Sequence, residues 1–303
     1  MYGTGTEFCY SECAQCGRLA LDEDIEDMSK FYPSESYCSF VQTTGRSRST
    51  AAFEALALAQ LGLRGQLVER LSRLAPKPPV VNWLKGVPTD ARVLDVGCGN
   101  GRVLAKMSRL GFTSLTGIDP FLPEAEIVIG GAVLRRVDLL SVHDEFDFIM
   151  FQHTLEHMPR HHATLEHAAK LLSPNGRILV RIPLAGSTAW DRYGVDWAQL
   201  DAPRHVMLHT PASMRRLAEQ VGLVVRSVRF DSTSFQFSAS ELYKRGRPLV
   251  NGLGVRQLRD EFGVGQLLRW EVEARRANRN ARGDQAAFVL EHRDGRSRAL
   301  AGA

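Results

Sequence analysis

The sequence predicts an α/β protein with a doubly wound, mostly parallel sheet, and two observations lead to this prediction. From residue 91 onward, short apolar segments alternate with segments in which apolar residues recur at helical spacing. Such alternation builds a sheet with helices on both faces. The composition agrees, because 303 residues that are 44% hydrophobic and 24% charged provide for one large core and a small appendage.

The chain divides into segments that differ in composition and periodicity. They are a cysteine-containing leader at 1–45, a helical lead-in at 46–85, the alternating core at 86–237, a helical insertion at 238–283, a final strand at 284–293 and a disordered tail at 294–303. Within the core, we expect strands at 91–97, 114–119, 132–138, 145–151, 176–183 and 223–230, and helices at 101–111, 162–172 and 211–222.

The charge and cysteine patterns limit the partners and the location of the protein. The net charge of +4 conceals an acidic start and an arginine-rich end, and the basic residues of that end are interleaved with acids. Interleaved charges favour solvated helix faces over a nucleic-acid track. No apolar run approaches the roughly 18 residues of a membrane span, and an odd number of cysteines does not suit a secreted disulfide scaffold. We therefore expect a cytoplasmic protein that neither binds nucleic acid nor spans a membrane.

A glycine-rich turn follows the first strand of the core, in the segment VLDVGCGNGR. Gly97, Gly99 and Gly101 let the backbone turn tightly and approach a ligand, although a turn that only joins strand to helix is the simpler alternative. Asp119 ends the second strand, where a carboxylate can accept hydrogen bonds from ribose hydroxyls. Asp138 ends the third strand beside two leucines, a combination that suits an adenine ring.

These motifs resemble those of the class I S-adenosylmethionine-dependent methyltransferases. The stretches VLDVGCGNG, GIDP, FDFIMFQHTLEHMP and LLSPNGRILVRIP match four motifs of that family in order, over about residues 85–230. The resemblance implies a seven-stranded, Rossmann-like sheet and S-adenosylmethionine as the cofactor. It implies that the backbone of the glycine-rich turn runs alongside the methionine portion of the cofactor. It also implies that Asp119 binds the ribose and that Asp138 and Leu139 bind the adenine. The implied cofactor contacts are Asp95, Gly97, Cys98, Gly99, Gly101, Asp119, Pro120, Asp138, Leu139 and Gln152.

The residues after the fourth strand bear on the methyl acceptor. Enzymes that methylate amino groups of nucleic-acid bases carry N/D-P-P-Y/F/W there, whereas this chain reads QHTLEH, which favours a hydroxyl acceptor. A hydroxyl gains from proton removal during attack, and a positioned histidine contributes roughly 10²–10⁴-fold. We expect a histidine general base, with His153 and His205 as the leading candidates and His157 as a third.

The same segment resembles the E-x-L-E-H element of ubiquinone-pathway O-methyltransferases, in which acids and a histidine can hold a divalent metal. Glu156 and His157 match that element, but His153 stands where the element has its first acid. Two alternatives therefore stay open. Either a metal assists at these residues, or Glu156 and His157 only brace the start of a helix.

The segment between the fifth strand and the next helix lies where such folds place a lid over the acceptor. Trp190, Tyr193 and Trp197 offer flat faces on which sugar rings stack, and Arg204 can bind a phosphate, although the tryptophans can equally fill the core. The phrases LDAPRH and HTPASMRRLAEQVGL resemble a subgroup of bacterial methyltransferases linked to surface-glycan and sugar modification.

Cys13 and Cys16, spaced C-x-x-C-G, offer half of a tetrahedral zinc site. A redox pair and a surface turn with free thiols are the alternatives. The sugar-linked subgroup begins with a zinc ribbon made from two such pairs, which implies that the leader is a partial ribbon with zinc at less than full occupancy. Cys9 and Cys38 lie where that ribbon requires no cysteine.

Together these observations predict an S-adenosylmethionine-dependent methyltransferase that acts on a hydroxyl of a sugar or glycan precursor. Two alternatives remain. One is an O-methyltransferase of a small phenol or quinol, and the other is a binding module that keeps the donor site without turnover.

Overall fold

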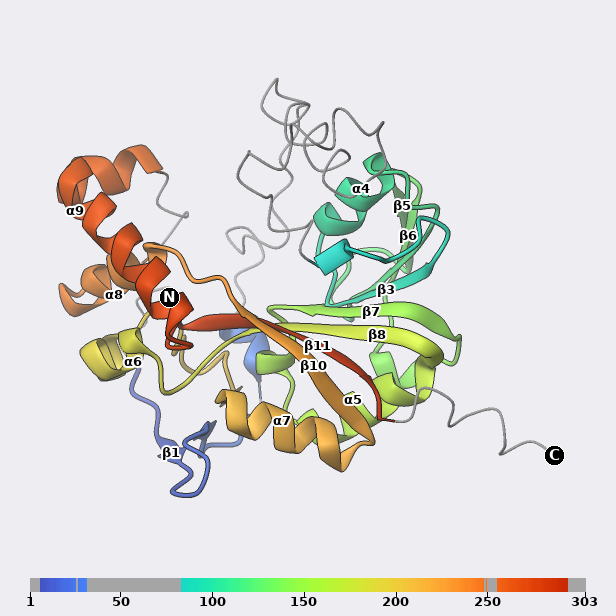
Figure 1. Cartoon of the computed structure of the whole chain (residues 1–303), viewed down its shortest axis with the longest axis horizontal. Helices are drawn as coiled ribbons and strands as arrows, with labels where there is room; N and C mark the ends of the chain where they lie inside the picture. The colour runs from blue at the N-terminus through green and yellow to red at the C-terminus, as the bar shows by residue number, and fades with distance from the viewer. Residues whose placement is uncertain (1–5, 26, 32–82, 248, 250–254, 294–303) are drawn as a thin grey trace.

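The computed structural model describes residues 6–25, 27–31, 83–247, 249 and 255–293, and its centre is a sheet flanked by helices (Figure 1). Eight strands form this sheet in the order β10-β11-β8-β7-β3-β4-β6-β5. They are β3 Arg92–Val96, β4 Ser114–Ile118, β5 Glu126–Ile129, β6 Ala132–Arg135, β7 Phe146–Gln152, β8 Leu172–Pro183, β10 Leu223–Phe230 and β11 Gln285–His292. Most of the expected lead-in at 46–85, the expected tail and Cys38 lie outside the described residues.

The strands predicted from the sequence are all present, and the middle of the sheet is parallel. β3 pairs in parallel with β4 and β7, β4 pairs with β6, and β7 pairs with β8. β11 runs antiparallel to both β8 and β10. The carboxyl ends of the parallel strands therefore share one edge, which is where open α/β sheets bind ligands.

The sheet has one strand more than the seven expected. The additional strand is β5, which pairs antiparallel with β6 at the edge of the sheet. Gly130 and Gly131 connect the two strands with φ of 56° and 87°, a conformation that suits a two-residue hairpin turn. The G-G dipeptide between apolar runs is the sequence signal for this hairpin.

Helices cover both faces of the sheet and bury its apolar side chains. On one face, α5 His161–Leu171 and α7 Pro211–Gln220 contribute Leu165 and Leu217 to a core that includes Ile149 and Val180. On the other face, α4 Arg102–Arg109 contributes Leu104 and Met107. The described residues also contain the short 3₁₀ helices η1 Met28–Phe31, in the leader, and η2 Leu139–Ser141, η3 Leu155–His157 and η4 Gly194–Asp196, in the core.

A group of helices lies beyond the carboxyl end of β8 (Figure 1). It comprises α6 Thr188–Tyr193, α8 Phe235–Lys244 and α9 Val255–Arg279, and α9 is bent at Gly263, whose φ of 74° is not helical. Trp197, Phe237 and Trp270 form the core between these helices. None of the helices in the part of the chain that the structure describes has both the length and the apolar character needed to cross a membrane.

The N-terminal leader forms a hairpin that pairs with the segment after His205. Its strands β1 Tyr10–Glu12 and β2 Leu19–Leu21 pair with each other, and β2 also pairs with β9 Met207–Leu208. The hydroxyl of Tyr10 donates a hydrogen bond to the carbonyl of His205 at 2.8 Å. Residues far apart in the sequence therefore form one small sheet beside the histidines.

Candidate functional site

The glycine-rich turn after β3 has the backbone that its sequence predicts. Gly97, Gly99 and Gly101 have φ of 72°, 51° and 71°, which glycine adopts without strain. A Cβ atom at Gly97 would lie 2.2 Å from the methyl carbon of Thr154. Thr154 follows β7, so this packing holds the glycine-rich turn directly against the segment that carries the candidate bases.

Two carboxylates lie beside this turn, at the ends of β3 and β4. Asp119 accepts hydrogen bonds from the N–H of Gly99 at 3.0 Å and of Phe121 at 2.9 Å. Asp95 is 2% exposed, and its Oδ1 has no hydrogen-bond partner among the described residues. Burial, followed by the charge of Asp119, raises the pKa of Asp95 to about 8. A buried carboxylate oxygen without a donor favours a ligand that brings positive charge or hydrogen-bond donors.

The residues expected to contact an adenine lie on the next strand ends. Asp138 accepts a hydrogen bond from the N–H of Leu140 at 2.9 Å. The expectation for Leu139 needs a correction, because its side chain is 4% exposed and packs in the core, which leaves only its backbone for a ligand. The apolar side chains exposed at this edge are Leu140, at 43%, and Phe121, at 66%, directly after Pro120.

Cys98 and Gln152 complete the set of expected cofactor residues. A Cβ atom at Gly117 would lie 2.7 Å from Cys98 Sγ, and burial raises the pKa of this thiol, so it remains a neutral packing group. Gln152 ends β7, and its Nε2 is buried without a hydrogen-bond partner in the described chain. Together with Asp95, Gln152 leaves both an acceptor and a donor unsatisfied near the turn.

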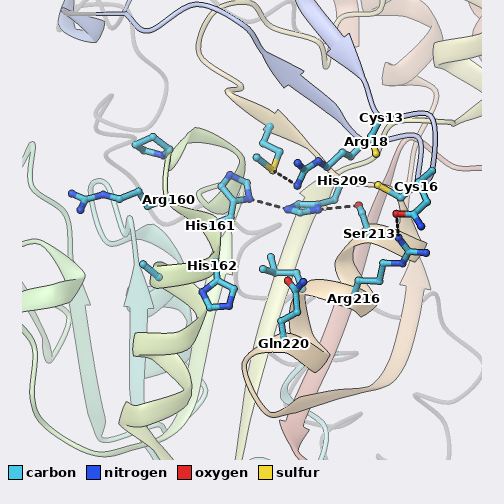
Figure 2. Close-up of a pocket in the computed structure, with 15 residues that line it drawn as sticks. Cys13, Cys16, Arg18, Arg160, His161, His162, His209, Ser213, Arg216 and Gln220 are labelled. Carbon is cyan, nitrogen blue, oxygen red and sulfur yellow. Dashed lines mark hydrogen bonds between the residues drawn. The ribbon is translucent and has the colours of Figure 1, made fainter.

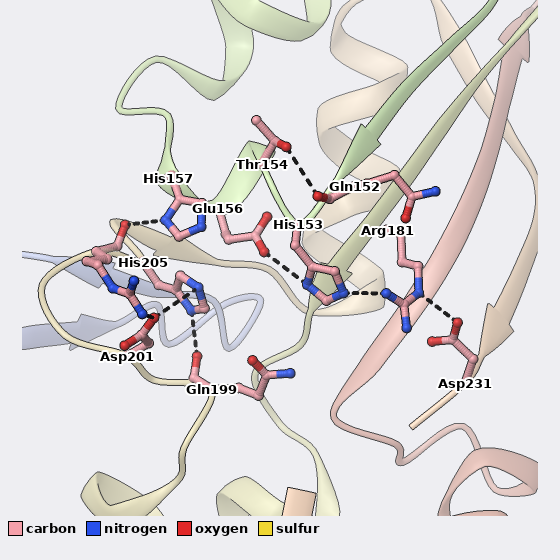
Figure 3. A network of polar contacts seen from close by, with 11 residues as sticks. Gln152, His153, Thr154, Glu156, His157, Arg181, Gln199, Asp201, His205 and Asp231 are labelled. Atoms are coloured by element: carbon pink, nitrogen blue, oxygen red, sulfur yellow. Dashed lines mark hydrogen bonds and ion pairs between the residues drawn. The ribbon is translucent and has the colours of Figure 1, made fainter. Parts of the chain in front are cut away.

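Glu156, His157 and His205 form a carboxylate–histidine cluster just beyond β7 (Figure 3). Each offers one ligand atom, and these atoms lie within 4.8 Å of one another. The carboxylate of Glu156 is 1% exposed, and neither of its oxygens accepts a hydrogen bond from the described residues. Burial raises the pKa of Glu156, whereas the neighbouring histidines act in the opposite direction.

Both histidines of the cluster are held by backbone carbonyls. Nδ1 of His157 lies 2.9 Å from the carbonyl oxygen of Arg204, and Nδ1 of His205 lies 2.7 Å from that of Gln199. A carbonyl only accepts, so each Nδ1 carries the proton and each Nε2 keeps its lone pair. Burial lowers the pKa of both rings to about 4, which keeps them neutral at physiological pH.

His205 has a further polar neighbour on its Nε2 side. Asp201 Oδ2 lies 3.7 Å from His205 Nε2 and also pairs with the buried guanidinium of Arg204. If Nε2 takes up a proton, the carboxylate of Asp201 stabilises the charge that forms. Asp201 has a φ of 42°, which costs a non-glycine residue on the order of 1–3 kcal/mol and occurs preferentially at functional sites.

His153 differs from His205 because both of its ring nitrogens have neighbours. Its Nε2 faces the guanidinium of Arg181, which only donates, and its Nδ1 lies 3.3 Å from Glu156 Oε1. Arg181 also donates to Asp231 at 2.7 Å. Burial and the charge of Arg181 lower the pKa of His153 to about 3. The lone pair that a base needs is thus already occupied, so the geometry argues against His153 as the general base.

Comparison with known proteins agrees with this arrangement. The family model described as "Methyltransferase domain" matches residues 60–228, which is more than half of the 303-residue chain. The chain belongs to this methyltransferase family. Its fold and family confirm the prediction of a class I S-adenosylmethionine-dependent methyltransferase.

Individual relatives of this methyltransferase include two curated enzymes. A ubiquinone biosynthesis O-methyltransferase of Aeromonas salmonicida is 26% identical over 234 residues, which cover 70% of this chain and 95% of the relative. The human EEF1A lysine methyltransferase 2 is 35% identical over 65 residues, but the match spans only 27% of that protein. Among solved structures, a Burkholderia thailandensis 1,6-didemethyltoxoflavin N1-methyltransferase is 13% identical with a TM-score of 0.45, covering 95% of this chain and 99% of that one.

The aromatic segment of the methyltransferase does not form the expected lid. Trp197 is fully buried and donates from Nε1 to Asp284 at 3.2 Å, and it packs edge-on against the partly buried Trp190. Arg204 is 4% exposed and paired with Asp201, so it is not available for a phosphate. The alternative in which the tryptophans fill the core is the one that the structure supports.

The cysteines of the leader lie in the turn between β1 and β2. The carbonyl of Cys13 accepts hydrogen bonds from the N–H of Cys16 at 3.3 Å and of Gly17 at 2.7 Å. Among the described residues, the carboxylate–histidine cluster is the only group of three or more histidine, cysteine or acidic side chains with converging ligand atoms. Cys13 and Cys16 therefore have no further metal ligand beside them in this part of the chain, and the expectation of zinc gains no support.

Four residues of the site were missed by sequence reasoning: Phe121, Arg181, Asp201 and Asp231. Arg181 interrupts an otherwise apolar strand, in GRILVRIP, and a charge within a buried strand is a signal that could have identified it. Asp201 and Asp231 carry no such signal, because their partners lie in contact only after folding.

Proposed function

We propose that the methyltransferase transfers a methyl group from S-adenosylmethionine to a hydroxyl of a small phenol or quinol. The observation that carries this proposal is the carboxylate–histidine cluster, which lies next to the donor turn through the contact of Thr154 with Gly97. The O-methyltransferase of A. salmonicida, which the chain matches over 95% of its length, supports the same acceptor class.

The donor fits the residues around the glycine-rich turn. S-adenosylmethionine carries positive charge on its sulfonium and ammonium groups, which suits the unsatisfied carboxylate of Asp95. We assign the ribose hydroxyls to Asp119, which still has acceptor capacity beyond its two backbone donors. Phe121 and Leu140 offer apolar cover for the adenine, with Asp138 at its edge. The remaining contacts are assigned to Gly97, Cys98, Gly99, Gly101, Pro120, Gln152 and the backbone of Leu139.

The proposed reaction is an in-line displacement in which this chain positions the acceptor and removes one proton. The acceptor oxygen attacks the methyl carbon, the carbon–sulfur bond breaks, and its electron pair stays on sulfur, which leaves S-adenosylhomocysteine. Holding the two reactants in line contributes up to about 7–11 kcal/mol in well-oriented systems. We assign the hydroxyl proton to Nε2 of His205, because Gln199 fixes the ring and Asp201 stabilises the imidazolium.

The carboxylate–histidine cluster also fits a divalent cation. Two imidazoles are held through Nδ1–H beside a buried carboxylate whose only polar side-chain neighbour described above is Nδ1 of His153, 3.3 Å from Oε1. Metal-binding histidines are usually held in this way. Two imidazoles favour zinc, iron or nickel over magnesium, which prefers oxygen ligands. A bound cation would lower the pKa of an acceptor hydroxyl. In that case His157 and His205 act as ligands, and the metal content of the purified protein distinguishes the two roles.

A sugar or glycan acceptor, the one first predicted, has less support than a phenol or quinol. Its basis was the resemblance of LDAPRH and HTPASMRRLAEQVGL to a sugar-linked subgroup, together with an aromatic lid and a phosphate-binding arginine. Both Trp197 and Arg204 are buried. The glycan link and the partial zinc ribbon at Cys13 and Cys16 are therefore not part of this proposal. The cytoplasm remains the proposed location.

A methyl-transfer assay with purified protein tests the proposal. The protein would be incubated with methyl-labelled S-adenosylmethionine and a catechol such as 3,4-dihydroxybenzoate, with and without added Mn²⁺ or Zn²⁺. We expect label on the catechol, and much less on nucleotide sugars. Calorimetric titration with S-adenosylmethionine is run alongside. Donor binding without transfer to any phenol or quinol would favour the non-catalytic module instead, and absence of donor binding would reject the proposal.

A further inference from the structure

A second cavity lies outside the donor site and the carboxylate–histidine cluster. It has a volume of about 580 Å³ and lies between the leader hairpin, the start of α5 and one face of α7 (Figure 2). His157 and His205 do not line it, but the residues four positions after each of them, His161 and His209, do. The cavity is therefore a neighbour of the proposed hydroxyl site and distinct from it.

The walls of this cavity carry positive charge and no acidic side chain. Three segments contribute one arginine each: Arg18 from the hairpin, Arg160 from the start of α5 and Arg216 from α7. Within the described chain, none of these arginines forms an ion pair with a carboxylate. Arg216 donates to the neutral Gln15 at 2.9 Å, and Arg18 lies 3.9 Å from the sulfur of Met207. Three guanidinium groups without acids around one cavity create a local excess of positive charge.

The amino end of α5 adds hydrogen-bond donors to the same cavity. Arg160 is the N-cap of this helix, and no side chain caps it. His161, His162 and Ala163 form its first turn and line the cavity, and the N–H groups of a first turn have no partner within the helix. The positive end of the helix dipole favours an anion at this place.

A buried histidine provides an independent observation. His161 begins α5 and is 4% exposed. Its Nδ1 lies 2.8 Å from Nε2 of His209, and the other ring nitrogen of His209 contacts Ser213 at 3.0 Å. Nε2 of His161 has no hydrogen-bond partner among the described residues. The hydroxyl of Ser213 donates to the carbonyl of Thr210, so the neutral rings carry their protons on Nδ1 of His209 and Nδ1 of His161. Nε2 of His161 therefore keeps a lone pair, which the hydroxyl of a protonated phosphate would satisfy.

We propose that this cavity binds the phosphate or diphosphate group of a small molecule, at a site separate from the methyl donor and acceptor. Arginine forks match phosphate oxygens in pairs, and the volume accommodates more than a single phosphate. The inference does not depend on the identity of the methyl acceptor, because none of its residues belongs to the carboxylate–histidine cluster.

Calorimetric titration of the full chain with inorganic diphosphate and with inorganic phosphate, at constant ionic strength, tests this site. We expect saturable binding of one diphosphate per chain, weakened at least about tenfold in Arg216→Gln and in Arg160→Gln variants. Arg215→Gln is the matched control, because Arg215 is also exposed on α7 but does not line the cavity. Circular dichroism checks that each variant is folded.

Two results of the titrations would overturn the proposal. One is the absence of saturable binding of either anion. The other is equal weakening in the Arg216→Gln and Arg215→Gln proteins, which would indicate diffuse surface charge. A parallel arm uses vesicles of phosphatidylglycerol and of phosphatidylcholine. Binding to the anionic vesicles without binding to diphosphate would assign the arginines to a membrane surface and would also reject the small-molecule site.

Discussion

The proposed donor side and the proposed acceptor side of this methyltransferase are built in different ways. The donor side depends on the backbone of one turn, Gly97 to Gly101, and on carboxylates at the ends of adjacent strands. The acceptor side depends on side chains, and its cluster joins Glu156 to His205, which lies 49 residues later. A turn and strand ends are local features that a sequence pattern reveals, whereas a cluster of side chains from distant segments depends on the folded chain.

The largest expected effect lies on the acceptor side. His205→Ala removes the Nε2 lone pair, so we expect turnover to fall at least about 10²-fold while the affinity for S-adenosylmethionine changes less than about twofold. Steady-state kinetics and calorimetry measure the two quantities. His143→Ala, an exposed histidine outside the site, serves as the control. A parallel loss of donor affinity would show that the two sides are not separable.

The donor side should show the opposite behaviour. Asp119→Ala removes a carboxylate that also fixes the N–H groups of Gly99 and Phe121, so we expect donor affinity to fall about 10- to 100-fold. Turnover at saturating donor should stay within a few fold of the unsubstituted enzyme. If turnover falls as strongly as in His205→Ala, then Asp119 contributes to the transfer step and the comparison fails.

The pH dependence of donor binding sharpens the role of Asp95. Its pKa of about 8 means that the free protein holds a proton there at neutral pH, and a cationic donor favours the ionised form. Affinity should therefore rise about tenfold between pH 7 and pH 9 and level off above the pKa. The same titration on the Asp95→Asn protein gives the pH dependence that comes from the amino group of the donor itself. Subtracting it from the profile of the unsubstituted protein leaves the contribution of Asp95. Identical pH profiles for the two proteins would contradict this role.

The smallest effect on activity is expected in the aromatic segment. Trp197→Phe removes the donor to the buried carboxylate of Asp284 and should lower the free energy of unfolding by about 1–3 kcal/mol, measured in urea. Turnover should remain within about twofold, and Trp190→Phe, at the partly buried neighbour, provides a comparison. A large loss of turnover with unchanged stability would restore the lid hypothesis.

The same contrast explains how far the sequence could be interpreted. All strands of the central sheet except β5, the parallel direction of the strands in the middle of that sheet and the turn at Gly97 follow from periodicity and glycine spacing, so they were predictable. The edge strand β5 was missed because four residues with one hairpin turn give a weak pattern. His153 was an attractive base from its position after β7, but no pattern indicates that Arg181, on a neighbouring strand, faces its Nε2.

Burial caused the other differences. The sequence does not indicate whether a tryptophan or an arginine in a polar segment faces a ligand or the core. In the structure, Trp197 and Arg204 face the core. His161 provides a further case, since no sequence pattern indicates that this histidine is buried against His209. Whether a side chain is buried here depends on how the N-terminal leader packs against the start of α7. Thr210 and Cys16, which form a hydrogen bond there, lie nearly 200 positions apart in the sequence.

The pairing of β2 with β9 gives the leader a part in the acceptor side. The segment that follows β8 carries His205, and it is anchored behind that residue by two backbone pairs to the hairpin and by the hydroxyl of Tyr10. The hairpin of residues 10–21 thus supports a loop that lies almost 200 residues later in the sequence. Shortened versions of this protein that begin at the methyltransferase core would keep the donor pocket and lose the support of its histidine loop.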